Sequence, residues 1–342
     1  MNKESHSPGK FFAAGAIYAA FAVYLYQPYL GSFNRWQYLL VVNPSLASLG
    51  CYVLSRRWVS SSVGSFFAGA IYGFGPFMLG LAKFHPTAGF LAATIPWLFC
   101  PAAFIPKTRW PRLWEACFSF LPFVAIIVFF QVSVQCRLFA VPRGAKLHLA
   151  DFFALVAPLV AANRGLTPVG FYHTPLAPFV MGFSMLLATR RIGVMTILAV
   201  AVVLAFCNSF LNVSPIMWFT IAALCCSILI GAGTQGLILA GFADRKWVLT
   251  IAGICGVLAI ATLLLATKYF QVFAGLAAEY ARVFTETGKM YTVGAVTMLV
   301  IFFLARAKLL VERRLPVRAI LLCLAMGADI FFGARFIVDR LL

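Results

Sequence analysis

Charged residues are scarce in this chain, and acidic residues are the scarcest. Only 11% of the 342 residues are Asp, Glu, Lys or Arg, and just nine are Asp or Glu, while 63% are hydrophobic. About a quarter of the residues of a soluble domain are charged. A globule of this size cannot hide so much apolar surface, because its exterior must be largely polar. The composition therefore excludes a soluble fold and predicts an all-α integral membrane protein.

Three further absences narrow the class of protein. The nine cysteines form no C-x-x-C pair and no Cys/His zinc spacing, so neither a disulfide framework nor a metal-cysteine site is expected. No long polar stretch interrupts the apolar segments, and residues 1–342 are expected to form a single polytopic membrane domain. No A-x-A cleavage site follows the first apolar segment, which is therefore expected to be a retained helix.

The charge that is present is mostly of one sign. Lysine and arginine number 27, which gives a net charge of +18. Basic patches can bind the phosphates of nucleic acid. Here, however, the basic residues stand in short clusters between apolar runs, so no nucleic-acid partner is expected and membrane lipid is the expected surrounding.

Apolar runs of membrane-crossing length recur along the chain. About 20 apolar residues are needed to cross the hydrocarbon core of a bilayer. On that criterion the sequence predicts about eleven transmembrane helices, over residues 11–29, 37–54, 62–82, 87–105, 114–134, 174–189, 192–210, 215–241, 247–267, 291–307 and 319–338.

The basic clusters orient these spans. With the N-terminus inside, every inner connection is short and basic: Arg56-Arg57, Lys107 with Arg109 and Arg112, Arg190-Arg191, Arg245-Lys246, and the group from Arg306 to Arg318. The short outer connections carry at most one basic residue. This is the pattern that the positive-inside rule requires, so the N-terminus is predicted to be cytoplasmic.

Two outer-face segments are longer, over 136–173 and 270–290. The first contains the apolar stretch 150–162, whose thirteen residues are too few to span, so it is predicted to be re-entrant or interfacial. In the second, apolar residues follow helical spacing and Glu279, Arg282 and Glu286 share the opposite side. That pattern predicts an amphipathic helix on the outer membrane surface.

One pair of neighbouring spans carries a recognisable motif. The first ends L-G-C-Y-V-L-S-R-R, and the second contains A-G-A-I-Y-G-F-G-P-F-M-L-G. The pair resembles the early core of the large bacterial YfhO-type membrane proteins and related GT-C-class glycosyltransferases. The matching residues are Gly50, Tyr52, Leu54, Arg56, Arg57, Gly69, Tyr72, Phe74, Pro76, Phe77 and Gly80. The resemblance implies a protein of the bacterial inner (plasma) membrane that handles a polyprenyl-phosphate-linked sugar at the outer face.

The chain departs from that pattern in its first outer loop. GT-C enzymes carry an acidic catalytic residue there, whereas residues 30–36 contain no Asp or Glu. The alternatives therefore stay open: a transferase, active or degenerate, a non-catalytic subunit with a membrane protein partner, or a transporter of small or lipidic molecules.

Charged groups on the outer side are the candidates for transferase chemistry. Such chemistry needs a carboxylate to take the acceptor proton and cations to hold the phosphate, for which arginine is favoured. Asp151 and Glu279 are the candidate catalytic acids, and Arg137, Arg143 and Arg282 the candidate lipid-phosphate ligands. Asp151 has an alternative role as a cap of the short helix that follows it. No cofactor is expected.

The histidines and the last span offer other polar groups. His85, His148 and His173 are predicted on the outer side, but they show no recognised ligand spacing, so no metal site is expected. Asp329 and Arg335 lie in or near the last span, where an ionisable residue is a functional hypothesis by default. They are nearly two turns apart, so partners on another helix are the alternative explanation.

Two motifs have structural explanations. Asn43-Pro44 falls within the second span, where the proline predicts a helix kink. The run G-A-G-T-Q-G at 231–236 matches a dinucleotide fingerprint only formally, because it lies inside a long apolar span. Small residues there are predicted to serve close packing of helices.

Overall fold

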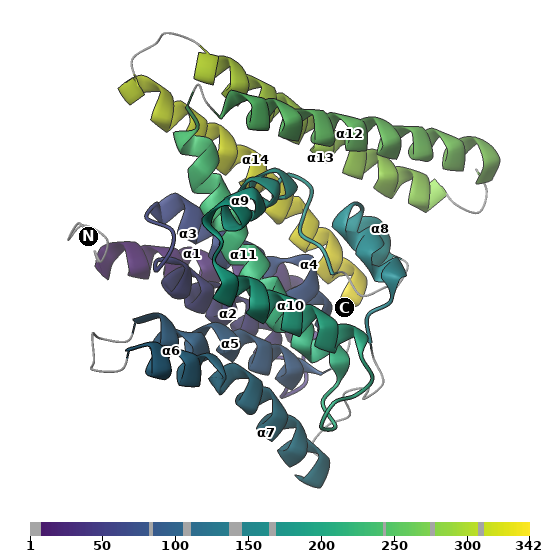
Figure 1. The fold of residues 1–342 in the computed structure, drawn as a ribbon. Helices are drawn as coiled ribbons and strands as arrows, with labels where there is room; N and C mark the ends of the chain where they lie inside the picture. Colours follow the sequence, from purple (N-terminus) through teal and green to yellow (C-terminus); the bar gives the residue numbers. More distant parts are fainter. Residues whose placement is uncertain are drawn as a thin grey trace.

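The computed structural model describes residues 8–81, 85–104, 111–136, 146–163, 169–241, 244–273, 278–306 and 311–342 (Figure 1). The α-helices are α1 (Pro8–Tyr26), α2 (Leu39–Ser55), α3 (Ser62–Phe74), α4 (Pro76–Gly80), α5 (Pro86–Phe104), α6 (Pro111–Ser119), α7 (Leu121–Cys136), α8 (Pro158–Asn163), α9 (Leu176–Thr189), α10 (Ile192–Phe206), α11 (Pro215–Leu239), α12 (Arg245–Phe273), α13 (Ala278–Arg306) and α14 (Val311–Leu341). Two 3₁₀ helices, η2 (Gln27–Ser32) and η4 (Leu149–Leu155), complete the element order.

The all-α prediction is confirmed for the described residues. They contain no β-strand, only an isolated bridge between Phe210 and Val213. Each of the eleven predicted spans coincides with a helix or a pair of consecutive helices. Eight of these are long and apolar enough to cross a membrane, whereas α2, α9 and α10 have 17, 14 and 15 residues. The chain thus has the make-up of a multi-pass integral membrane protein.

The predicted surface helix over 270–290 is wrong as a separate element. Helix α12 runs on to Phe273, and α13 begins at Ala278 and continues through the span predicted at 291–307. Helices α12 and α13 lie side by side as a long antiparallel hairpin at the top of Figure 1. The amphipathic stripe has a protein partner: Val283 and Phe284 belong to a buried cluster, and the Phe284 ring meets Phe153 edge-on.

The thirteen-residue stretch 150–162 forms most of η4 and α8, both too short to cross a membrane, as predicted. Part of it is buried: Ala154 and Ala157 are fully covered, whereas Phe153 is exposed, and α8 packs on α13 and α14. The backbone carbonyl of Val156 accepts a hydrogen bond from the Tyr291 hydroxyl on α13 (2.7 Å). The stretch is therefore part of the packed interior.

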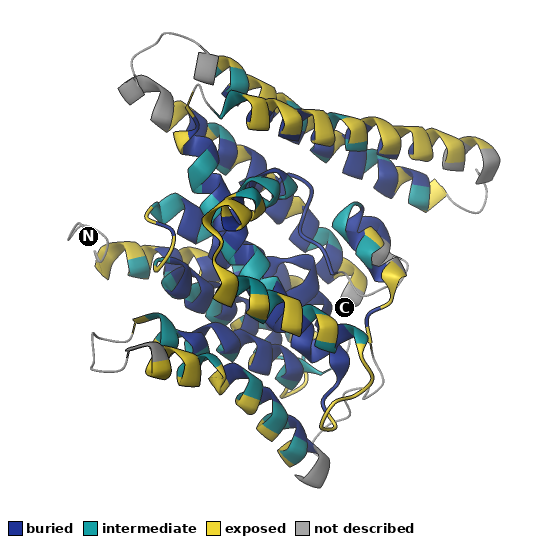
Figure 2. Ribbon diagram, in the orientation of Figure 1, coloured by how far each residue is buried: buried dark blue, intermediate teal, exposed yellow. Residues whose placement is uncertain are grey.

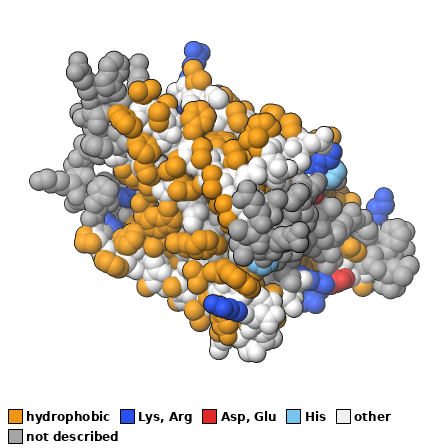
Figure 3. Space-filling model, turned by 90° about the horizontal axis from the view of Figure 1, so that it is seen from below, with side chains coloured by type: hydrophobic (Ala, Val, Ile, Leu, Met, Phe, Trp, Pro, Cys, Tyr) orange, Lys and Arg blue, Asp and Glu red, His pale blue; other side chains and the backbone are white. Residues whose placement is uncertain are grey.

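Burial separates central from peripheral helices (Figure 2). The α3–α4 segment is 89% buried and α11 72%, whereas the α6–α7 segment is only 22% buried, although it is as apolar as α11. The face at the bottom of Figure 1 carries mostly hydrophobic side chains (Figure 3). An apolar exterior over an equally apolar interior is what a lipid solvent allows.

Hydrogen bonds connect helix ends that the predicted topology places on the same side of the membrane. At one end, the Tyr29 hydroxyl just after α1 donates to Asp339 near the end of α14 (2.8 Å). At the other, the Gln235 side chain near the end of α11 accepts from the backbone N–H groups of Ser60 and Ser61. The buried Arg318 guanidinium donates to the carbonyls of Ile238 and Ala240, where α11 ends. Connections predicted to share a side therefore lie together.

The glycines of 231–236 serve helix packing, as predicted. A methyl group on Gly231 would lie 2.7 Å from the carbonyl oxygen of Gly64 on α3. One on Gly233 would overlap the carbonyl of Pro178 on α9. Helix α11 thus makes close backbone contacts with α3 and with α9. These contacts are possible because glycine has no side chain.

The residues that carry the GT-C resemblance also pack helices together. Gly50 leaves room for the Trp97 ring, since a methyl group there would lie 2.5 Å from its Nε1. Gly69 likewise leaves room for the Tyr18 hydroxyl. The buried Tyr72 hydroxyl donates to the Ala92 carbonyl (2.7 Å). The motif therefore has a packing explanation that is independent of any chemistry.

Candidate functional site

Asp329 is a fully buried carboxylate in the last helix. It is 1% exposed and lies one residue past the midpoint of the candidate span Pro316–Arg340. At 1.5 Å per residue it stands about 9 Å along the α14 axis from Arg335. A buried charge needs close polar partners, because transfer out of water is otherwise very costly.

The partners come from an extended segment of the chain, residues 169–175, between α8 and α9. Every residue of this segment is buried. Non-helical backbone deep inside a membrane protein is tolerated only where protein groups satisfy its N–H and C=O groups. The segment therefore depends on hydrogen bonds from the helices around it.

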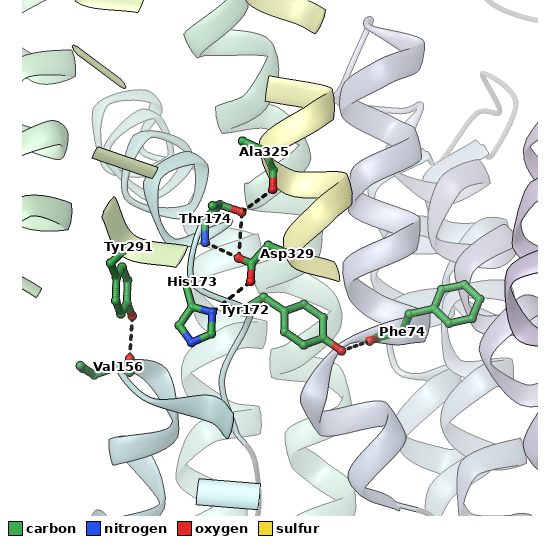
Figure 4. A network of polar contacts seen from close by, with 8 residues as sticks. All are labelled: Phe74, Val156, Tyr172, His173, Thr174, Tyr291, Ala325 and Asp329. Carbon is green, nitrogen blue, oxygen red and sulfur yellow. Dashed lines mark hydrogen bonds and ion pairs between the residues drawn. The ribbon is translucent and has the colours of Figure 1, made fainter. Parts of the chain in front are cut away.

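The Asp329 carboxylate supplies several of those bonds (Figure 4). One oxygen accepts from the backbone N–H of Thr174 at 2.5 Å and from its hydroxyl at 2.8 Å. The other lies 3.0 Å from Nδ1 of His173. An ionised carboxylate only accepts, so in that state Nδ1 is the donor of this hydrogen bond. A single side chain of α14 thus anchors two consecutive residues of the extended segment.

Tyr172 connects the same segment to a second helix, α3. Its ring lies over Gly333, where a methyl group would be 2.4 Å from the ring carbons. Its hydroxyl donates to the carbonyl of Phe74 at 2.6 Å, where α3 ends (Figure 4). That carbonyl is available because α3 stops at Gly75 and α4 restarts at Pro76.

The second ring nitrogen of His173, Nε2, is a candidate reactive atom. The imidazole is fully buried, and its Nε2 has no hydrogen-bond partner within the described residues. The ring stands edge-on to Tyr291 at a centroid distance of 5.2 Å. With Nδ1 donating to Asp329, neutral His173 presents a lone pair at Nε2. A carboxylate that orients an imidazole and stabilises its protonated form makes the imidazole a proton acceptor, as in hydrolase triads.

The sequence-predicted site residues are not brought together with this centre. The Asp151 carboxylate accepts from the backbone N–H of His148 at 2.7 Å. His148 is the N-cap of η4 and Asp151 lies within that helix at N3, so Asp151 stabilises the start of η4 but is not the N-cap that the alternative predicted. Glu279 forms an ion pair with Arg340, and Arg282 is exposed on α13. Arg137 and Arg143 lie outside the described residues.

The other polar residues of the sequence also find local roles. Arg335 forms an ion pair with Asp339 one turn on (3.0 Å) and donates to the Leu25 carbonyl, so it does not pair with Asp329. Asp329 instead has its partners on the non-helical segment before α9, and not on another helix as the alternative explanation expected. No group of three or more His, Cys, Asp or Glu side chains positioned for a metal occurs in the described parts of the chain.

His85 caps the start of α5 just outside the apolar helix. Its Nδ1 lies 2.7 Å from the Thr87 hydroxyl and accepts from the Thr87 backbone N–H at 3.3 Å. Partial burial lowers the pKa of His85 below 6.5, because desolvation disfavours the charged imidazole. The neutral ring is the form that caps the helix.

Comparison of the chain with protein-family models, with curated proteins and with solved structures gives no match. No relative therefore indicates what the His173–Asp329 centre does, and its geometry is the basis for proposing a function. Asp329 stood out in the sequence as a charge within an apolar span. Its pairing with His173, 156 positions away, leaves no local signal in the sequence.

Proposed function

We propose that this chain is a multi-pass membrane carrier for a small molecule and that His173, Thr174 and Asp329 form its substrate-handling centre. The observation that supports this most strongly is the buried carboxylate at mid-span holding a buried, non-helical segment. Carriers commonly build their sites near the middle of the membrane from interrupted helices. An ionisable residue at that depth usually marks the path of a substrate or ion.

The proposed carrier crosses a bacterial plasma membrane eleven times, with its N-terminus in the cytoplasm. The alternation of basic clusters and the grouping of helix ends support this orientation. The stretch 150–162 is proposed to be re-entrant from the outer side. Helices α2, α9 and α10 extend only about 20–26 Å at 1.5 Å per residue, so residues that flank them complete their spans.

A native thiol next to the centre provides the test. A methyl group on Gly294 would lie 3.9 Å from Sγ of Cys255 and 3.7 Å from Cγ2 of Thr174, so Cys255 borders the same space. Cys255 is 1% exposed. In a working carrier, water and small solutes must enter the centre at intervals, whereas a purely structural polar core stays closed.

The experiment uses a chain in which every cysteine except Cys255 is replaced by alanine, folded in detergent. Its probe is a small, water-soluble methanethiosulfonate. We expect Cys255 to be modified under native conditions, at a rate that changes in Asp329→Asn. A matched chain that retains only Cys207, which is exposed just after the end of α10, is the control for reagent activity. Persistent inertness of Cys255 beside a reactive Cys207 would contradict the carrier proposal.

A lipid-linked-sugar transferase of GT-C type, active or degenerate, is the second candidate. The observation in its favour is that Asp151, its proposed base, is a carboxylate only 4% exposed within a segment predicted on the outer side. Its test is native mass spectrometry of protein extracted in mild detergent. A co-purifying polyprenyl phosphate that is lost on combined Arg137→Ala and Arg143→Ala substitution would favour this candidate. Bulk phospholipid alone would remove it and leave the carrier or a non-catalytic subunit.

A further inference from the structure

A second polar site lies away from the His173–Asp329 centre, at the end of the bundle where α1 and α4 finish and α2 and α5 begin. It is a small open pocket whose interior has room for about one water-sized group, lined by Tyr26, Leu40, Asn43, Pro44, Met78 and Gly89 among others. No charged side chain occurs among its described lining residues. The pocket therefore favours an uncharged occupant.

Asn43 brings an unused acceptor to this pocket. Its side chain is 3% exposed, and its Nδ2 donates to the carbonyl of Pro86 at 2.9 Å. That carbonyl can only accept, so the amide nitrogen must face it and Oδ1 must face away. Oδ1 has no hydrogen-bond partner within the described residues. A buried acceptor left unpaired costs free energy, about 1–3 kcal/mol, unless something donates to it.

Two backbone features reinforce the arrangement. Pro44 has no N–H, so the carbonyl of Leu40 lacks its usual helical donor, and both residues lie in the pocket wall. Gly89 allows Asn43 to approach α5, because a methyl group there would lie 2.8 Å from Nδ2. Among its described residues the wall thus offers the unpaired acceptor of Asn43 and no cation.

We infer that this pocket binds the hydroxyl end of an uncharged amphiphilic alcohol. The hydroxyl donates to Oδ1 of Asn43, and the carbon chain lies against the apolar side chains of Leu40 and Met78. The dimensions admit the hydroxyl end, while the chain extends through the mouth. The inference is independent of the carrier proposal, since it uses none of the residues of the His173–Asp329 centre.

The test is photolabelling of the full chain, in detergent, with an octanol that carries a diazirine on its chain. We expect the label on the peptide containing Met78, with at least fivefold less label in excess 1-octanol. Octyl methyl ether, which cannot donate a hydrogen bond, should compete several times more weakly. Asn43→Leu should abolish this label, while Asn34→Leu, at an exposed position, should leave it unchanged.

Competition on the unsubstituted protein keeps the inference testable even where Asn43→Leu does not fold. Equal competition by the alcohol and the ether would overturn it, because the acceptor would then contribute nothing. Label confined to the outer faces of lipid-exposed helices such as α12 would overturn it as well.

Discussion

At the scale of single residues, Asp329 anchors the buried segment 169–175 to α14. Its two oxygens satisfy an N–H, a hydroxyl and an imidazole of one extended segment. In a low-dielectric interior these charge-assisted bonds are strong, and the groups they satisfy would otherwise be buried unpaired. The same carboxylate therefore supports the fold and orients the His173 ring, whose Nε2 has no hydrogen-bond partner among the described residues.

The cost of removing that carboxylate is the first prediction. Asp329→Ala leaves the Thr174 N–H and the His173 ring without their acceptor, and we expect a loss of about 3 kcal/mol in stability, as for other broken buried pairs. Thermal unfolding in detergent measures it. Asp339→Ala, at an exposed ion pair, should shift the midpoint far less. Equal shifts in the two variants would show that Asp329 does not anchor the segment.

A second prediction concerns pH and His85. The pKa of His85 is lowered in the fold, so the unfolded chain binds the proton more readily. The stability that neutral His85 contributes is therefore present above pH 6.5 and is lost as the pH falls below it. Thermal midpoints at pH 8 and pH 5 should differ more in the unsubstituted chain than in His85→Asn, which keeps a capping acceptor without titrating in this range. An identical pH dependence in both would contradict this role.

At the scale of elements, close contact between helices depends on glycine, which has no side chain. Helices α9 and α11 meet at Gly182 and Gly233, each of which faces backbone of the other helix. Because lipid offers no hydrophobic drive for helices to associate, such backbone approaches and their van der Waals contacts carry much of the cohesion. The formal nucleotide motif of α11 is explained entirely by this packing.

Alanine substitution at these positions tests that account. Gly233→Ala places a methyl group on the Pro178 carbonyl, and we expect it to destabilise the protein by about 1–3 kcal/mol or more through overpacking. Gly253→Ala on α12 is the control, since nothing lies within 4 Å of its added methyl group. That change should be neutral or slightly stabilising, because alanine favours helix. A well-tolerated Gly233→Ala would show that the helices do not approach as closely as described.

The elements were predictable because their signals are local. Apolar length located the helices, eight of which are long and apolar enough to cross a membrane, and small residues within a span indicated packing. Breaks within a helix were harder to predict, since Gly75-Pro76 divides one predicted span into α3 and α4. The apolar stripe at Val283 and Phe284 is a contact with other parts of the protein, whereas its amphipathic pattern alone had assigned it to the membrane surface. The site was half predictable. Asp329 stood out as an intramembrane charge, but its partner depends on how segments distant in sequence pack.

At the scale of the whole molecule, the His173–Asp329 centre lies among apolar helices. The α3–α4 segment and α11 form the middle, α14 contributes Asp329, and the α12–α13 hairpin contributes the buried Cys255 and Tyr291. The charged groups of the described chain otherwise lie mainly near helix ends. A carrier, an outer-face transferase and a non-catalytic subunit differ in whether, and from which side, water reaches this centre.

The most direct measurement is the sidedness of Cys255 modification in vesicles. A chain with Cys255 as its only thiol is placed in right-side-out and inside-out membranes and treated with a membrane-impermeant methanethiosulfonate. The carrier account predicts modification from both sides, at rates that change in Asp329→Asn. Modification from the outer side alone would contradict a carrier and fit an outer-face site, and no modification from either side would leave the centre a structural core.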